Sequence, residues 1–228
     1  MKEPDFARVL AAAAHLQALV PDAVLVGGTA AAQRAGHRVS LDADHVLVDL
    51  TERFDVLIEA LEATDGWATA RVRRPVLILG NLDGVDTGIR QLIRRRPLDV
   101  EELSLAGGAR LRVPTIAEMT RIKAWLALRR NATRDYIDLV ALAELLGSGA
   151  ARVLARLDEY YADQLGPDGR RVATQLARQL AEPAPYDRSD VDLAHYRRLA
   201  PRWRQWTAIV SACQTLAMGI LDAVLAGE

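Results

Sequence analysis

The chain has 228 residues, half of them hydrophobic, and a formal net charge of −1 at pH 7. This length suffices for one large domain or two modest ones with buried cores. The balanced charge excludes a uniformly basic nucleic-acid-binding surface but allows local basic patches. Cys213 is the only cysteine, which excludes an internal disulfide framework and a multi-cysteine zinc site and favours a reducing, cytoplasmic location.

The first half of the sequence is predicted to alternate helices with short strands. Apolar residues at helical spacing indicate a first helix that ends before Pro21. Asp83 and Gly84 separate two apolar runs, and an Asp-Gly pair in this position predicts a tight β-hairpin. The predicted elements are, in order, helix 5–19, strand 23–26, helix 29–36, strand 42–50, helix 51–66, hairpin strands 74–82 and 85–93, and strands 101–106 and 109–114.

Beyond the last of these strands the pattern becomes helical, and two domains are predicted, 1–113 and 114–228. The apolar C-terminal segment is long enough to cross a bilayer, but Gln214 and Asp222 would be costly at that depth. It is therefore predicted to be a buried closing helix, and no membrane association is expected. The predicted helices of this half are 115–130, 133–147, 149–163, 168–181 and 199–226.

Two aspartates, Asp42 and Asp44, stand one residue apart where a predicted strand begins. In a strand their side chains share a face, and carboxylate oxygens are the ligands that Mg²⁺ prefers. An Asp-x-Asp pair alone is more often a solvated strand edge, so a two-ion site for phosphoryl chemistry needs a third carboxylate from a neighbouring strand. Asp83 and Asp86 are the candidates, and Asp86 is favoured because the hairpin turn explains Asp83. Asp49 could compete, but its odd offset from Asp44 turns it to the opposite face.

A glycine turn precedes the two aspartates. Gly27 and Gly28 end a buried strand just before a helix, where free backbone N–H groups and the helix dipole can receive phosphate. Thr29 adds a hydroxyl, and Arg38 and Ser40 follow the helix immediately before the acidic pair. A Gly-Gly-Thr turn alone is usually only a tight connection. The ordered combination predicts a nucleotide triphosphate site with bound metal.

Lys123 is one of only two lysines among the 29 basic residues, the other being Lys2. A lysine ammonium is a compact point charge suited to a phosphate oxygen, so Lys123 is a candidate phosphate contact with its ammonium at the edge of packed surface. Asp135, twelve residues on, could interact with Lys123 or lie near the nucleotide. Arg134 and Asp138 are four apart on the same predicted helix and can pair with each other.

Two stretches together resemble a known family. "VGGTAAAQRAGHRVSLDADHVL" and "TIAEMTRIKAWLALRRNATRDYIDLVAL" are similar to the motifs of AbiEii/AbiGii-type nucleotidyltransferase toxins, a branch of the DNA polymerase β-like nucleotidyltransferase superfamily. The resemblance covers about residues 20–145. It implies an α+β fold, in which a nucleotidyltransferase core with a mixed or antiparallel sheet flanked by helices precedes a helical C-terminal lobe.

The resemblance also implies roles for particular residues. Gly27, Gly28 and Thr29 would bind the triphosphate, and Asp42 and Asp44 would bind metal. Lys123 would contact a nucleotide phosphate. Asp135 would be the polar residue of the closing helical motif. His45 departs from the usual residue after the second aspartate, but it should face away from the metals. The implied activity is Mg²⁺-dependent transfer of NMP from an NTP to an acceptor, the tRNA 3′ end, by a toxin with a cognate antitoxin.

Alternatives remain open at this point. Arginine clusters at 71–75, 93–97 and 196–206 could meet RNA phosphate with Trp203 and Trp206 as stacking surfaces, or form solvated faces over core tryptophans. A small molecule or a protein side chain could be the acceptor instead, which would favour an acidic acceptor pocket. An inactive nucleotide-binding module is the third hypothesis, and it is favoured if Asp86 points away from the other two aspartates.

Overall fold

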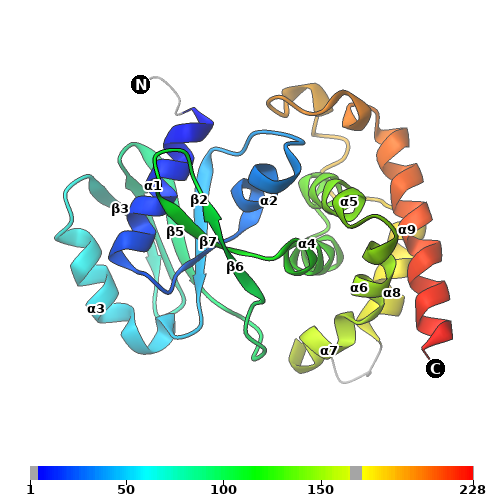
Figure 1. The fold of residues 1–228 in the computed structure, drawn as a ribbon, viewed down its shortest axis with the longest axis horizontal. Coiled ribbons are helices and arrows are strands. Elements are labelled where there is room, and N and C mark those ends of the chain that lie inside the picture. The colour runs from blue at the N-terminus through cyan, green and yellow to red at the C-terminus, as the bar shows by residue number, and fades with distance from the viewer. Residues whose placement is uncertain (1–4, 165–170, 228) are drawn as a thin grey trace. The chain divides into compact units, whose positions relative to one another are not determined.

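The computed structural model describes residues 5–164 and 171–227 (Figure 1). Contacts between residues divide the chain into two compact units. The sheet unit comprises residues 1–30 and 40–115, and the helical unit comprises residues 31–39 and 116–228. The sequence did not predict that residues 31–39, which lie between the glycine turn and the aspartates, belong with the C-terminal helices.

The sheet unit contains a mixed sheet, as expected. Its elements are α1 (Phe6–Leu19), β1 (Val24–Leu25), the start of α2 (Gly27–Ala35), β2 (Asp42–Leu47), α3 (Leu50–Glu62), β3 (Trp67–Arg73), β4 (Leu77–Leu82), β5 (Val85–Gln91), β6 (Val100–Ser104) and β7 (Arg110–Pro114). The main sheet has the order β1-β2-β5-β4-β3, with β2 and β5 parallel and the other pairs antiparallel. Strands β6 and β7 pair separately.

The hairpin between β4 and β5 is confirmed. Asp83 and Gly84 form its turn, with φ values of 55° and 81°, and an Asp-Gly pair accepts such positive angles readily. Strand β3 was not predicted, although apolar and polar residues alternate from Ala68 to Arg73; most of its residues are exposed, because it lies at the edge of the sheet. Pairing with β4 supplies the hydrogen bonds that order it.

Helices α1 and α3 pack on one face of the main sheet (Figure 1). Alternate residues of β2 are buried on that face, and Leu47 joins a core with Leu16, Phe54 and Ile89. Burying each such side chain stabilises the fold by about 1.5–3 kcal/mol. The alternation places Asp42 and Asp44 on the opposite face of the sheet.

The helical unit has its own hydrophobic core. Its helices are α4 (Ile116–Arg130), α5 (Thr133–Leu146), α6 (Ala150–Ala155), α7 (Leu157–Tyr161), α8 (Val172–Ala181) and α9 (Trp206–Ala226). The helix predicted over 149–163 is interrupted at Arg156, where α6 ends and α7 begins. The predicted start of the next helix at 168 lies outside the described residues. Trp203 lies in the core, which rules out the stacking surface considered for it.

Helix α9 corrects the expectation of a buried closing helix. Ile209, Cys213 and Ile220 are buried on one side, while Met218 and Leu225 are 62% and 70% exposed on the other. Its length and composition would allow it to cross a membrane, and 28% of its most apolar window is buried. Met218 and Leu225 share the exposed side with Ser211, Gln214 and Asp222, so the helix packs through one side only.

Candidate functional site

The strand register brings three aspartates onto one face of the main sheet. In the parallel pair β2–β5, Asp42 lies opposite Asp86, and Asp44 lies opposite Gly88. Residues paired in this way point to the same side of a sheet, and so do residues i and i+2 of one strand. The shared face is the one opposite α1 and α3, so its carboxylates are not in the hydrophobic core.

Two glycines make room for the Asp44 carboxylate. A Cβ added at Gly88 would lie 3.2 Å from Asp44 Oδ1 and 2.6 Å from Leu79 Cδ2, and one at Gly27 would lie 3.5 Å from Asp44 Oδ2. Arg90, two residues after Gly88 on the same face, places its Nε 3.7 Å from Asp44 Oδ1. Asp44 is therefore bordered by the glycine turn on one side and by a partly exposed guanidinium on the other.

Asp83 lies elsewhere in the sheet unit. Its carboxylate Oδ2 is 2.7 Å from Nδ1 of His15, and its carbonyl accepts a hydrogen bond from Arg8. Asp86 instead accepts a 3.1 Å hydrogen bond from the amide of Asn81, its cross-strand neighbour. The geometry thus places Asp86, and not Asp83, on the face that carries Asp42. Asp86 shares a sheet face with Asp42 and Asp44, but its carboxylate contacts Asn81 and does not form a three-carboxylate group with theirs in the described residues, so the inactive nucleotide-binding module remains an alternative.

The three aspartates carry the type of ligand atom that a hard divalent cation prefers. All three aspartates offer carboxylate oxygens, which suit Mg²⁺, from one face of the sheet. Within residues 5–164 and 171–227, no group of three or more His, Cys, Asp or Glu side chains is close enough together to hold a metal ion. Asp42 and Asp86 are exposed, so a site here requires these two side chains to turn toward Asp44.

The glycine turn is fixed to the start of β2. Gly27 opens α2 with a φ of +75°, a conformation that favours glycine, and the preceding N–H, from Val26, donates to the Asp44 carbonyl at 2.8 Å. The buried Thr29 hydroxyl donates to the Asp42 carbonyl at 2.5 Å. The hydroxyl predicted to face a triphosphate therefore locks α2 to β2, which leaves the backbone N–H groups of the turn as phosphate donors.

His45 faces the core side of the sheet, as expected. It is fully buried, with Nδ1 3.1 Å from the Ala43 carbonyl. Burial lowers the pKa of His45 to about 4, although backbone contacts partly oppose the shift. The imidazole is therefore neutral near pH 7. Ser40 is also buried, at the entry to β2.

Asp138 is the centre of a buried ionic cluster in the helical unit. Arg38 donates to both of its oxygens, at 2.6 and 2.9 Å, and Lys123 Nζ lies 2.7 Å from Oδ2. Nε2 of the fully buried His37 is 2.7 Å from Oδ1. Burial alone would raise the pKa of Asp138, but Lys123, Arg38 and His37 hold it well below its usual range. Asp138 therefore pairs with Arg38, Lys123 and His37 and not with Arg134, the partner considered from the sequence.

The cluster changes the expectations for Lys123, Asp135 and Arg38. Lys123 is 3% exposed, so its ammonium does not emerge at an edge. Its Nζ lies 3.7 Å from Asp135 Oδ1, which bears out the predicted contact between the two. Asp135 is fully buried and accepts two hydrogen bonds from Arg130. Arg38, expected near nucleotide, is bound bidentately to Asp138 and has a side chain only 8% exposed.

The chain matches a known protein family over most of its length. The sequence profile described as nucleotidyl transferase AbiEii toxin of a type IV toxin–antitoxin system matches residues 8–218. This chain belongs to the AbiEii family. The AbiEii membership confirms the resemblance to nucleotidyltransferase toxins drawn from the motifs.

Solved structures share the fold of this AbiEii-family chain. MenT4, a nucleotidyltransferase toxin from Mycobacterium tuberculosis H37Rv, is 18% identical, with a TM-score of 0.59 over 96% of this chain and 90% of that one. A candidate nucleotidyltransferase from H. pylori is 14% identical, with a TM-score of 0.52 over 98% and 96% of the two chains. At these identities the likeness supports the α+β fold.

Curated relatives of the AbiEii-family chain are much longer proteins. The mycolic acid-containing lipids exporter MmpL11 of Mycolicibacterium smegmatis is 36% identical over 138 residues, which cover 60% of this chain and 14% of that protein. The probable transport protein MmpL11 of Mycobacterium leprae is 32% identical over 171 residues, 75% of this chain and 15% of that protein. The chain spans about one seventh of the length of these relatives.

Sequence reasoning missed three residues around the candidate sites. Arg90 could have been found, because Asp86, Gly88 and Arg90 alternate along one strand and so share a face. Asp138 and His37 gave no such signal. They are 101 residues apart, and only the association of residues 31–39 with the helical unit brings them together.

Proposed function

We propose that this AbiEii-family chain transfers a nucleoside monophosphate from an NTP to the 3′ end of tRNA, using Mg²⁺. The observation that carries the proposal is the shared sheet face of Asp42, Asp44 and Asp86 beside the glycine turn at Gly27. A cognate antitoxin would neutralise the activity, and a cytoplasmic location fits an NTP-dependent toxin.

Each part of the site has a proposed role. Asp42, Asp44 and Asp86 hold the metal, and backbone N–H groups at Gly27 and Gly28 receive the triphosphate at the start of α2. Two Mg²⁺ ions held by these carboxylates would supply positive charge to stabilise the α-phosphate and the leaving pyrophosphate. During transfer the acceptor hydroxyl gives up its proton to solvent, its oxygen bonds to the α-phosphorus, the bond from that phosphorus to the β-phosphate oxygen breaks, and pyrophosphate leaves.

The buried cluster is proposed to position residues in the helical unit. Direct contact of Lys123 with phosphate would require its Nζ to leave Asp138, which lies 2.7 Å away in a buried site. We therefore assign Lys123 and Asp135 to the framework that orders the segment containing Arg38. Val39 and His37 in that segment are also held by backbone hydrogen bonds to residues 197 and 200.

RNA is proposed as the acceptor because arginines lie on exposed surface. Arg71 and Arg73 on β3 are exposed, as required of phosphate contacts. Trp206 is half-buried, packs edge-on against Tyr136 and has Arg188 over its ring, so we do not assign it as a base-stacking surface. The acceptor contacts are accordingly expected to be mainly electrostatic.

The test is to incubate the purified protein with each labelled NTP, Mg²⁺ and total RNA, with Asp44→Ala as the control. Label in tRNA that is absent with Asp44→Ala supports the proposal. Label on protein or on a small molecule would move the acceptor to those classes. No transfer with any NTP would favour an inactive nucleotide-binding module.

A further inference from the structure

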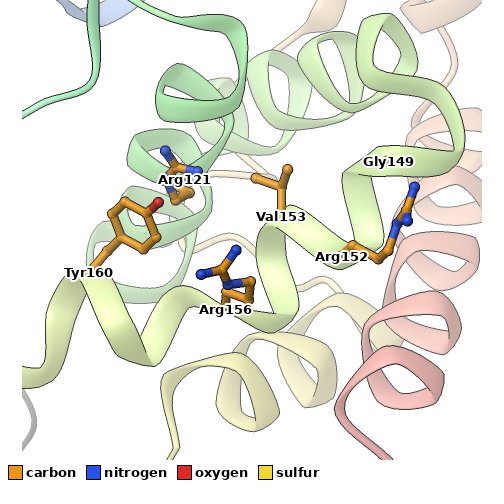
Figure 2. Close-up of a pocket in the computed structure, with 6 residues that line it drawn as sticks. All are labelled: Arg121, Gly149, Arg152, Val153, Arg156 and Tyr160. Atoms are coloured by element: carbon orange, nitrogen blue, oxygen red, sulfur yellow. The ribbon is translucent and has the colours of Figure 1, made fainter. Parts of the chain in front are cut away.

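A pocket of about 390 Å³ in the helical unit has a wall rich in arginine. Its lining residues come from α4 and from the stretch that runs from the short turn before α6 through α6 into α7, and they are Arg121, Gly149, Arg152, Val153, Arg156 and Tyr160. Figure 2 shows Arg121 and Tyr160 at one side of the pocket and Arg152 and Gly149 at the other. The wall thus contains guanidinium groups and a phenol but no carboxylate.

Two of the arginines are held in place by glutamates outside the lining. Arg121 is buried, with Nη2 2.8 Å from Glu118 Oε2, and its guanidinium lies 3.8 Å from the centre of the Tyr160 ring. Arg156 uses Nε and Nη2 to donate to Glu159. Pairing of this kind fixes the direction of a guanidinium, which otherwise loses side-chain entropy on binding a ligand.

Arg152 gives the pocket a positive charge that neither Glu118 nor Glu159 neutralises. It is exposed, and among the described residues it has no ion-pair partner. The bonds from Arg156 to Glu159 leave its Nη1 group for another acceptor, since a guanidinium has five N–H donors. Planar, paired donors of this type match the oxygens of a phosphate group.

The size of the pocket restricts the ligand further. A volume of about 390 Å³ lies in the range of small-molecule sites and far exceeds that of one phosphate ion. Val153 and Gly149 form an uncharged part of the wall, which suits a sugar rather than a second charged group. Arg121 covers one face of the Tyr160 ring, and Tyr160 is only 8% exposed, so its ring leaves little surface on which a base could stack.

We propose that this arginine pocket binds the sugar-phosphate part of a nucleotide, held through its phosphate by Arg152 and Arg156. The source is either a free nucleotide or a nucleotide within an RNA strand, which share this chemistry. The site goes beyond the proposed transfer reaction, and none of its lining residues belongs to the set assigned to that reaction.

The test measures binding in EDTA without NTP, so it does not depend on nucleotidyl transfer. Calorimetry with AMP and fluorescence anisotropy with a labelled 12-nucleotide single-stranded RNA are applied to wild type and to Arg152→Gln/Arg156→Gln. The control is Arg178→Gln/Arg202→Gln, which makes the same charge change at exposed positions of the helical unit outside the pocket. Arg202 pairs with Glu144 as Arg156 pairs with Glu159, so the two double variants are matched.

The pocket variant is expected to weaken binding at least tenfold, and the control less than threefold. A tenfold loss with AMP assigns the pocket to free nucleotides, and a loss with RNA alone assigns it to the strand. Equal losses in the two variants, or no binding of either probe to wild type, would overturn the proposal. Hexaglutamate is a third probe, which carries carboxylates in place of phosphates. If the pocket variant lost hexaglutamate binding as strongly as binding of the phosphate probes, the proposal would be overturned, because the pocket would then bind an acidic protein segment.

Discussion

Replacing Asp138 with asparagine tests the buried cluster most directly. The substitution keeps the size of the side chain but removes the charge that faces Lys123 and Arg38, whose side chains are 4% and 8% exposed. Two buried cations would then lack their shared counter-charge. Breaking a buried ion pair from one side costs about 3–5 kcal/mol. We expect Asp138→Asn to lower the free energy of unfolding by about 4 kcal/mol, a large share of the roughly 5–15 kcal/mol typical of proteins.

Urea unfolding followed by tryptophan fluorescence is a suitable assay, because Trp125, Trp203 and Trp206 all lie in the helical unit. The control is Glu144→Gln, which removes a partly exposed pair with Arg202 and should cost less than about 1 kcal/mol. The reasoning is refuted if Asp138→Asn costs no more than this control.

A double-mutant cycle separates charge from packing. Lys123→Met in the Asp138→Asn background removes one of the two cations that faced the Asp138 carboxylate, so the double variant should be at least about 1 kcal/mol more stable than the sum of the single effects predicts. Additive effects would show that the ammonium and the carboxylate do not stabilise each other. The cycle is read from the same urea curves.

The pH dependence has a defined sign. The pKa of Asp138 is lowered on folding, so its contribution is fully present above the unfolded value of roughly 3.9 and is lost as pH falls through the lower folded value. The stability difference between wild type and Asp138→Asn should therefore be constant from pH 5 to 7 and shrink only in more acidic solution. A difference that already shrinks above pH 5 would contradict the lowered pKa.

Three further predictions concern the proposed site. Asp44→Ala should abolish transfer yet change stability by less than about 1 kcal/mol, because the Arg90 contact is long and partly exposed; a large fall in thermal stability in magnesium-free buffer would make Asp44 a structural residue. Asp86→Asn should remove most of the rise in melting temperature that NTP and Mg²⁺ give the wild type, and Asp83→Asn should not, since asparagine suits the same turn; the reverse result would make Asp83 the third ligand. Lys123→Arg should lower both stability and activity, because the larger guanidinium overfills a buried site; wild-type values in urea unfolding and labelled-NTP transfer would refute this.

Local patterns were enough to predict much of the sheet unit. The Asp-Gly pair specified the β4–β5 hairpin through its tolerance of positive φ, and strand alternation put Asp42 and Asp44 on one face. Because Asp83 was needed for the turn, Asp86 was the candidate left for the neighbouring strand. These inferences depend on residues close together in sequence, where backbone geometry alone decides which way a side chain points.

Tertiary structure decided the features that depend on distant segments. Strand β3 is ordered by its pairing with β4, and packing covers only one side of α9, which leaves the apolar Met218 and Leu225 exposed on the other. The buried cluster joins Arg38 to Asp138, 100 residues later, and turns a predicted phosphate contact at Lys123 into an interior ion pair. Ion pairs of this kind form only when the fold brings distant residues together and removes their charges from water. Neither condition can be read from a local sequence pattern.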